Sequence, residues 1–248
     1  MKDTFILKNE TIDSFMSGRL SVIQSITGYR FSVDAIHLAL FVKTKAEEIA
    51  IDLGTGCGII PMILLKTTKI REVWGLEIQE ELVSQAARNA KINDLQDKMK
   101  IVRGDIRYLP FRRECADIVI CNPPYRKKQD GRLNPDPRKA IARHEILVSI
   151  SEIFDAAKYL LKKGGKLILI YPIEKLTDLF SNLIKKNLQP KRIRINYPSI
   201  HSNARLVLVE AVLGGRPGLT IEPPLLGQDG TLLSDFLNRV QESTNTNA

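Results

Sequence analysis

The feature that most limits the possible folds is the alternation, from residue 47 onward, of short apolar runs with longer helical patterns. Runs of strand length cover residues 48–53, 73–78, 100–104, 117–121 and 166–171. Helical patterns cover residues 59–66, 79–93, 149–161 and 176–187. The runs are continuously apolar, which is typical of strands buried on both faces of a sheet. The alternation therefore predicts an α/β fold, with a mostly parallel, doubly wound sheet and helices on both of its faces.

Two further strand-like runs, at residues 191–197 and 205–213, complete the pattern but are spaced differently from the others. Only residues 198–204 separate them, and a segment of this length is too short for a crossover helix. We therefore expect them to pair as an antiparallel hairpin. The predicted sheet then has seven strands, one of which runs antiparallel to its neighbours.

The chain divides into three parts on this basis. Residues 1–46 lie outside the alternation and contain a short strand candidate at 20–24 and a helical pattern at 34–42. We expect them to form an N-terminal extension packed on the main domain, which covers residues 47–225. Residues 226–248 form a C-terminal tail that we expect to be partly disordered, because its last residues are polar.

Charge and composition narrow the classes of partner. The chain has 37 Lys and Arg against 28 Asp and Glu, a net charge of +9, which favours a polyanion such as RNA, although a basic solvated surface gives the same balance. Cys57, Cys115 and Cys121 lack metal-binding spacing and the three histidines are scattered, so we expect no metal. No apolar stretch reaches the roughly 18 residues of a membrane span. We expect a cytoplasmic protein, monomeric or weakly dimeric, with no membrane association.

A glycine-rich loop, residues 52–58, follows the first predicted strand and opens a helix. Glycines permit a tight turn and close approach of a ligand, while the helix start offers N–H groups to an anionic part of it. Gly54, Gly56 and Gly58 give the spacing Gly-x-Gly-x-Gly, whereas the dinucleotide fingerprint has its third glycine one position later. The loop alone does not choose a cofactor.

Acidic residues mark the ends of three predicted strands. Asp52 lies within the glycine loop, Glu77 ends the next strand, and Asp105 follows the third. At the carboxyl edge of a parallel sheet, where ligands bind in such folds, Glu77 is placed to accept from ribose hydroxyls. Asp105 is placed to accept from an adenine amino group. The alternative is that each acid caps the end of its strand.

The sequence Asn122-Pro123-Pro124-Tyr125 ends the fourth predicted strand. Two prolines force a sharp turn, which directs an amide side chain, backbone carbonyls and an aromatic ring into one space. An amide oxygen and a carbonyl oxygen can accept both hydrogens of an exocyclic NH₂ group, and tyrosine can stack on the ring that carries it. Together with the glycine loop and the acids, this motif predicts S-adenosylmethionine as the cofactor and a planar amine as the methyl acceptor.

Residues 28–35, 52–58 and 122–125, together with 143–145 and 206–210, resemble the bacterial tRNA(Val) adenine-N6 methyltransferase family, and the resemblance covers residues 10–224. It implies a Rossmann-like class I methyltransferase fold and methylation of the N6 amine of an adenine in the tRNA anticodon loop, next to the anticodon. It also implies that Asn122, Pro123 and Tyr125 are catalytic. The cofactor contacts that we expect are Asp52, Gly54, Thr55, Gly56, Cys57, Gly58, Glu77, Ile78, Asp105, Ile106, Asn122, Phe31, Ser32 and Asp34.

The segment 126–143 carries seven basic residues against two acidic ones, and its glycine and prolines predict an irregular loop beside the site. The substrate contacts that we expect are Pro124, Tyr125, Arg126, Lys127, Lys128, Arg138 and Arg143, although a solvated surface loop is the plainer interpretation. A solvated face explains a second basic group equally well; its members are Lys185, Lys186, Lys191, Arg192 and Arg194.

Three other functions remain open at this point. A protein-glutamine N5-methyltransferase would use the same motif on a side-chain amide. That class carries a longer N-terminal helical domain, which is not expected here, and the basic loop also argues against it. A methyltransferase for amino groups of rRNA or DNA would need a target-recognition region, which only residues 1–46 could supply. A non-enzymatic RNA-binding protein would have no use for an intact glycine loop beside an intact Asn-Pro-Pro-Tyr motif.

Overall fold

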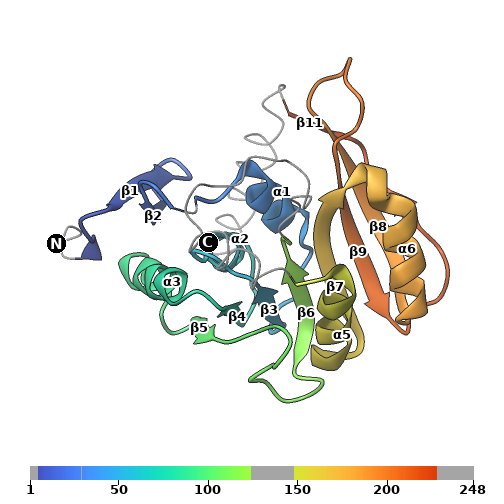
Figure 1. Cartoon of the computed structure of the whole chain (residues 1–248), viewed down its shortest axis with the longest axis horizontal. Coiled ribbons are helices and arrows are strands. Elements are labelled where there is room, and N and C mark those ends of the chain that lie inside the picture. Colours follow the sequence, from blue (N-terminus) through green and yellow to red (C-terminus); the bar gives the residue numbers. More distant parts are fainter. Residues whose placement is uncertain (1–4, 29, 124–147, 228–248) are drawn as a thin grey trace, which may run out of the picture.

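The computed structural model describes residues 5–28, 30–123 and 148–227, and its centre is one large twisted sheet (Figure 1). Within these ranges the sheet has the strand order β10-β8-β9-β7-β6-β3-β4-β5, and β11 also pairs with β8. The parallel strands of the main domain are β3 (Ile49–Leu53), β4 (Glu72–Glu77), β5 (Met99–Arg103), β6 (Ala116–Cys121) and β7 (Leu161–Pro172). This is the α/β arrangement that the apolar runs predict.

The antiparallel hairpin is also present. β8 (Leu188–Tyr197) pairs antiparallel with β9 (Leu206–Leu213), which in turn pairs antiparallel with β7. β9 is thus the one reversed strand among the seven that the sequence predicts. Two additional strands of two residues each, β10 (Thr220–Ile221) and β11 (Leu225–Leu226), pair with the outer edge of β8 and bring the sheet to nine strands.

Helices cover both faces of the sheet. α1 (Val33–Phe41), α2 (Ile59–Thr67) and α3 (Glu80–Ile92) contribute to one apolar layer, and α5 (Ile150–Leu160) and α6 (Leu176–Lys185) contribute to the other. A short 3-10 turn, Ile173–Lys175, precedes α6. β5 and β6 are joined by residues 104–115 without a helix. None of the helices in the described part of the chain is long and apolar enough to cross a membrane.

The N-terminal extension forms a separate two-stranded antiparallel sheet. β1 (Glu10–Phe15) and β2 (Leu20–Ser25) turn through Met16, Ser17 and Gly18, all of which have positive φ. Figure 1 shows this hairpin beside α3, at the end of the molecule opposite β8. β2 and α1 lie close to their expected positions, whereas β1 was not expected from the sequence. The expected disorder of the tail falls largely on residues 228–248, which lie outside the described ranges.

Candidate active site at the carboxyl edge of the sheet

The ends of the central strands bring the predicted site residues to one edge. Leu53, the last residue of β3, pairs with Leu76 of β4 and with Cys121 of β6. The glycine loop, Glu77 and Asn122 follow these three positions directly along the chain. Parallel pairing in register therefore places all three features at the carboxyl edge of neighbouring strands, where α/β sheets bind ligands.

The glycines of the loop have different physical roles. Gly54, Gly56 and Gly58 all have positive φ, which side chains rarely adopt. A Cβ atom at Gly54 would meet nothing within 4 Å, so the loop is open on that side. A Cβ atom at Gly58 would lie 2.3 Å from the Cε atom of Met99 and 3.3 Å from the Cβ atom of Ala86. Gly58 is thus required for packing, while Gly54 borders open space.

Asp52 lies beneath the loop and is completely buried. The Thr55 hydroxyl donates to its Oδ2 at 2.7 Å, and its Oδ1 has no hydrogen-bond partner among the described residues. Burial raises the pKa of Asp52 to about 7; the Thr55 hydrogen bond opposes this rise and the charge of Glu77 adds to it. Gly75 of β4 makes room for this pair, because a Cβ atom there would lie 2.7 Å from the Thr55 Cγ2 atom.

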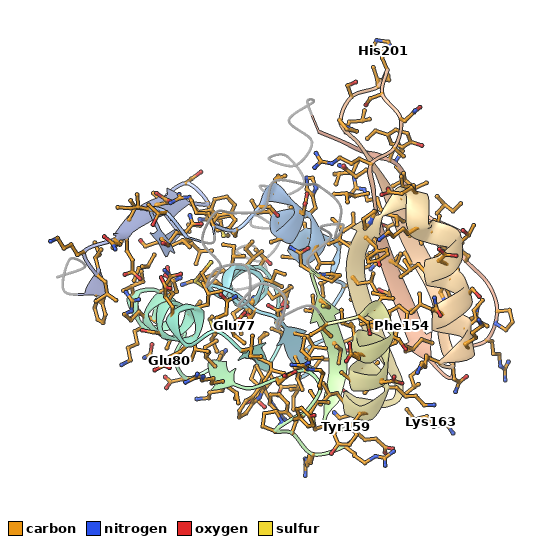
Figure 2. The ribbon with its side chains drawn as sticks, in the orientation of Figure 1. Glu77, Glu80, Phe154, Tyr159, Lys163 and His201 are labelled. Carbon is orange, nitrogen blue, oxygen red and sulfur yellow. The ribbon has the colours of Figure 1, made fainter. Side chains whose placement is uncertain are left out.

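Glu77 is held by backbone N–H groups of the glycine loop and of the residues just before α3, beside which Figure 2 shows it. Its Oε2 accepts from the N–H of Gly56 at 2.9 Å, and its Oε1 accepts from the N–H groups of Ile78 and Gln79, both at 3.0 Å. A carboxylate has about four acceptor positions, so these three bonds fix its orientation and leave capacity for a ligand hydroxyl.

Asp105 lies two residues beyond the end of β5, and Arg107 binds its side chain. The Arg107 Nε donates to both carboxylate oxygens at 3.0 Å, and Nη2 donates to Oδ2 at 2.6 Å. The hydrogen bond from Arg107 holds the pKa of Asp105 below its usual value. An adenine amino group would therefore have to share this carboxylate with Arg107. Ile106 is partly buried against the apolar layer of α5 and α6.

Asn122 and Pro123 follow β6 at the same edge, where Cys121 also pairs with Leu169 of β7. Pro123 is buried and Asn122 partly so. The remaining residues of the predicted substrate site lie outside the described ranges; they are Pro124, Tyr125, Arg126, Lys127, Lys128, Arg138 and Arg143. Their contacts with substrate stay a prediction.

The start of α1 forms another part of this edge. The Phe31 N–H donates to the side-chain oxygen of Gln24 at 3.1 Å, and the Phe31 ring packs edge-on against Phe15. Ser32 is the N-cap residue of α1. Burial raises the pKa of Asp34, and the positive charge of Arg205, just before β9, opposes the rise. The expected cofactor contacts Phe31, Ser32 and Asp34 thus lie on one segment. Residues of β1 and β2 and the charge of Arg205 in the β8–β9 hairpin interact with this segment.

Comparison with a family model decides what kind of domain this is. The model of the methyltransferase small domain matches residues 33–188, more than half of the chain and all of the strands that form the candidate site. This chain belongs to the methyltransferase small domain family.

Curated relatives agree with this assignment. A protein of Tolumonas auensis named tRNA1(Val) (adenine(37)-N6)-methyltransferase is 28% identical over 162 residues, which cover 65% of this chain and 67% of the relative. A protein of Porphyromonas gingivalis strain W83 with the same name is 27% identical over 175 residues, covering 67% of this chain and 68% of the relative.

Solved structures confirm the fold. A predicted O-methyltransferase from Agrobacterium tumefaciens has a TM-score of 0.65 and 21% identity, covering 84% of this chain and 96% of its own. Geranyl diphosphate C-methyltransferase from Streptomyces coelicolor, solved with S-adenosyl-L-homocysteine, has a TM-score of 0.53 and 13% identity, covering 73% and 78%. The methyltransferase domain thus has the class I methyltransferase fold that the sequence predicts.

Sequence reasoning missed the side chains that attach the N-terminal hairpin to this methyltransferase domain. Gln85 and Asn89 of α3 and Asn93, its C-cap residue, are buried on one stripe, and each hydrogen-bonds to β1 or β2. The signal was present in the sequence, because amides at i, i+4 and i+8 on the core side of an amphipathic helix require partners.

The second basic group is largely engaged within the methyltransferase itself. Lys186 pairs with Asp155 at 2.6 Å, the Lys191 ammonium donates to the Arg216 carbonyl, and Arg192 is buried. The contacts of Lys186 and Lys191 favour a solvated face of the protein, whereas Arg192 is buried with internal partners and does not belong to such a face.

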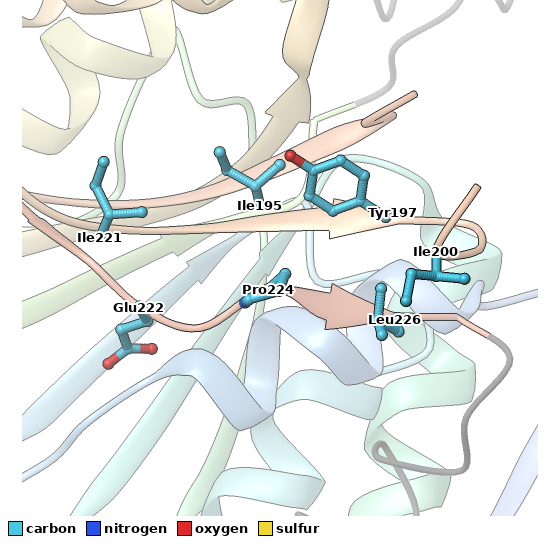
Figure 3. Close-up of a pocket in the computed structure, with 7 residues that line it drawn as sticks. All are labelled: Ile195, Tyr197, Ile200, Ile221, Glu222, Pro224 and Leu226. Carbon is cyan, nitrogen blue, oxygen red and sulfur yellow. The ribbon is translucent and has the colours of Figure 1, made fainter. Parts of the chain in front are cut away.

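Among the described residues no group of three or more His, Cys, Asp or Glu could hold a metal ion. An apolar pocket lies against β8, several strands away from the glycine loop, and Figure 3 shows its seven lining residues, which are Ile195, Tyr197, Ile200, Ile221, Glu222, Pro224 and Leu226. This pocket takes no part in the candidate site.

Proposed function

We propose that this protein transfers a methyl group from S-adenosylmethionine to the exocyclic N6 amine of an adenine in tRNA, in the anticodon loop next to the anticodon. The observation that carries the proposal is the position of Asn122 and Pro123, directly beside the glycine loop at the carboxyl edge of the sheet. The name shared by the curated relatives supports the substrate.

Three features of the edge fit S-adenosylmethionine. The backbone at Gly54 borders open space, Glu77 keeps capacity to accept from a ribose hydroxyl, and the buried Oδ1 of Asp52 has no partner within the described ranges. Gly54 and Glu77 would hold the cofactor, with Asp52 and Thr55 supporting the loop from below. When bound, the cofactor supplies a methyl carbon that is electrophilic because it is attached to a sulfonium.

The residues of β6 would act on the adenine amine. Its lone pair is delocalised into the ring, so the amine is a poor nucleophile. The Asn122 side-chain oxygen and the Pro123 carbonyl would accept its two hydrogens and favour a pyramidal nitrogen, with the lone pair directed at the methyl group. As the new N–C bond forms, the bond from the methyl carbon to sulfur would break, and the surplus proton of the methylated nitrogen would pass to water. Catalysis then comes from alignment and charge complementarity and needs no strong base. Tyr125 would stack on the base, which an anticodon loop can turn outward at low cost.

Charge supports a nucleic-acid substrate. The net charge is +9, and basic residues between 126 and 143 follow the Asn-Pro-Pro-Tyr motif along the chain. A protein that acts on tRNA works in the cytoplasm, so we infer that location from the substrate. We expect a monomer or weak dimer, with residues 1–46 as an extension of the methyltransferase domain.

The test is transfer of labelled methyl from S-adenosylmethionine to bacterial tRNA that lacks N6-methyladenosine, followed by nucleoside analysis. We expect label in N6-methyladenosine at one anticodon-loop position. The Asn122→Ala variant should bind S-adenosylhomocysteine as the wild type does but lose at least about 100-fold in turnover. Label absent from tRNA but present on a glutamine of a protein, or on rRNA, would overturn the substrate and keep the reaction class.

A further inference from the structure

β2 lies with one edge against α3, and side chains of the helix bond to this edge. The Ile23 N–H donates to the Asn89 Oδ1 at 2.6 Å, and Asn89 Nδ2 returns a bond to the Ile23 carbonyl at 3.1 Å. Asn93 does the same for Ser21, at 2.9 and 2.8 Å. Residues i and i+2 of a strand are about 6.6 Å apart, close to the separation of side chains at i and i+4 on a helix. The two amides thus replace a neighbouring strand.

Only one of these amides also reaches the glycine loop. The second hydrogen of Asn89 Nδ2 goes to the backbone carbonyl of Cys57 at 2.9 Å. Asn93 bonds instead to the Asn89 carbonyl and to the Met62 sulfur. Asn89, Ile23 and Cys57 are all completely buried, so water cannot replace these bonds.

α3 touches the loop at a second point next to this one. A Cβ atom at Gly58 would come within 3.3 Å of Ala86, which precedes Asn89 by less than one helical turn. The helix therefore limits the position of Cys57 through a hydrogen bond and that of Gly58 through packing. The N–H of Gly56 is fixed from the other direction by Glu77, just before α3.

We infer that Asn89 is a positioning residue for the cofactor: it sets the glycine loop through Cys57 and couples the loop to the N-terminal hairpin through Ile23. This inference rests on the proposed function in one respect, namely that the loop binds S-adenosylmethionine. After β2, the chain leads directly to Phe31, Ser32 and α1. Asn89 accordingly connects two segments of the candidate site that are far apart in sequence.

Asn89→Ala and Asn93→Ala form a matched pair, because both remove a reciprocal bond to β2 and only the first removes the bond to the loop. Binding of S-adenosylhomocysteine is measured by calorimetry on the full chain, at a temperature where circular dichroism shows both variants folded. We expect both to unfold at lower temperature, Asn89→Ala to bind about tenfold more weakly, and Asn93→Ala to stay within about twofold of the wild type. Equal losses, or no loss in either variant, would overturn the inference.

Hydrogen exchange on the wild type tests the same coupling without any substitution. S-adenosylhomocysteine should slow exchange of the Ile23 amide more than that of the Ser21 amide, because coupling between two sites is reciprocal. Protection of the glycine loop with no change at Ile23 would contradict the coupling. If the protein binds S-adenosylhomocysteine but does not methylate tRNA, the proposed substrate is wrong. The role of Asn89 is then still tested by the binding and exchange measurements. No binding by the wild type would overturn both.

Discussion

The candidate site contains two buried acidic side chains, Asp52 near the end of β3 and Glu77 at the end of β4. Their surroundings differ. Glu77 accepts three backbone N–H groups, which fix the orientation of its carboxylate. Asp52 accepts only the Thr55 hydroxyl, and burial raises its pKa to about 7. The difference follows from position, because Glu77 adjoins a helix start whereas Asp52 lies beneath the loop.

The Asp52→Asn variant should show how the buried Asp52 carboxyl group makes stability depend on pH. The folded-state pKa of Asp52 is above the unfolded value of 3.8, so its protonated form favours folding; that contribution is complete below about pH 4 and is lost as pH rises through about 7. We expect the free energy of unfolding of the wild type, relative to the variant, to fall by roughly 2–4 kcal/mol between pH 4 and pH 8. Urea denaturation at several pH values measures this difference.

The control for this series is Asp97→Asn, at an exposed position on the loop before β5. Its unfolding free energy should run parallel to that of the wild type across the same pH range. If the Asp52→Asn profile is parallel as well, then Asp52 is ionised throughout and receives a hydrogen bond that the structure does not show.

At the scale of elements, the sequence predicted what depends on local pattern. Continuous apolar runs identified β3 to β9 because strands buried on both faces need them. β1 was not predicted because Glu10–Phe15 has few apolar residues. It is stabilised by pairing with β2 and by the hydrogen bonds that Arg88 and Gln85 donate to Glu10. β10 and β11 are two residues long and exist only through their pairing with β8.

The candidate site follows the same division. Strand ends are readable from sequence, so the glycine loop, Glu77 and Asn122 were placed correctly at one edge. The engagement of Asp105 by Arg107 depends on how residues 104–108 turn, and the contact of Asn89 with Cys57 depends on how α3 packs. Neither can be read from an apolar pattern, because the first depends on the conformation of one short turn and the second on tertiary packing.

α5 supplies the prediction at the element scale. Its start is a capping box: the Ser149 Oγ accepts from the Glu152 N–H at 3.2 Å, and Glu152 Oε2 accepts from the Ser149 N–H at 2.6 Å. Ser149→Ala should lower the free energy of unfolding by about 1 kcal/mol, because the Glu152 N–H at the helix start loses its partner. Ser151→Ala, at an exposed position of the same turn, should stay within about 0.5 kcal/mol of the wild type. Urea denaturation compares the two, and equal losses would exclude the cap as the cause.

At the scale of the whole molecule, Arg192 connects parts of the chain that are distant in sequence. Its buried guanidinium lies 3.7 Å from the ring centroid of Phe41, at the end of α1, and donates to the Phe41 carbonyl at 2.8 Å. It also pairs with Glu210 of β9 at 2.6 Å and with Glu222, after β10, at 3.2 Å. The N-terminal extension, the β8–β9 hairpin and the last described strands thus meet at one side chain, towards the opposite edge of the sheet from the Asn89 contact.

Removing this guanidinium leaves the partly buried Glu210 without this cation and Glu222 with only the exposed Lys43, which costs far more than losing a surface pair. We expect Arg192→Met to lower the free energy of unfolding by roughly 3–5 kcal/mol. Arg192→Lys should recover only part of this loss, because an ammonium cannot pair with Glu210 and Glu222 in the geometry of the planar fork. Lys43→Met removes an exposed partner of Glu222 and should cost no more than about 1 kcal/mol. Denaturant unfolding measures the loss of stability in the three variants. Equal losses in Arg192→Met and Lys43→Met would mean that α1 is held on the sheet by apolar packing alone. In that case the charges around Glu222 would contribute little to joining the two ends of the fold.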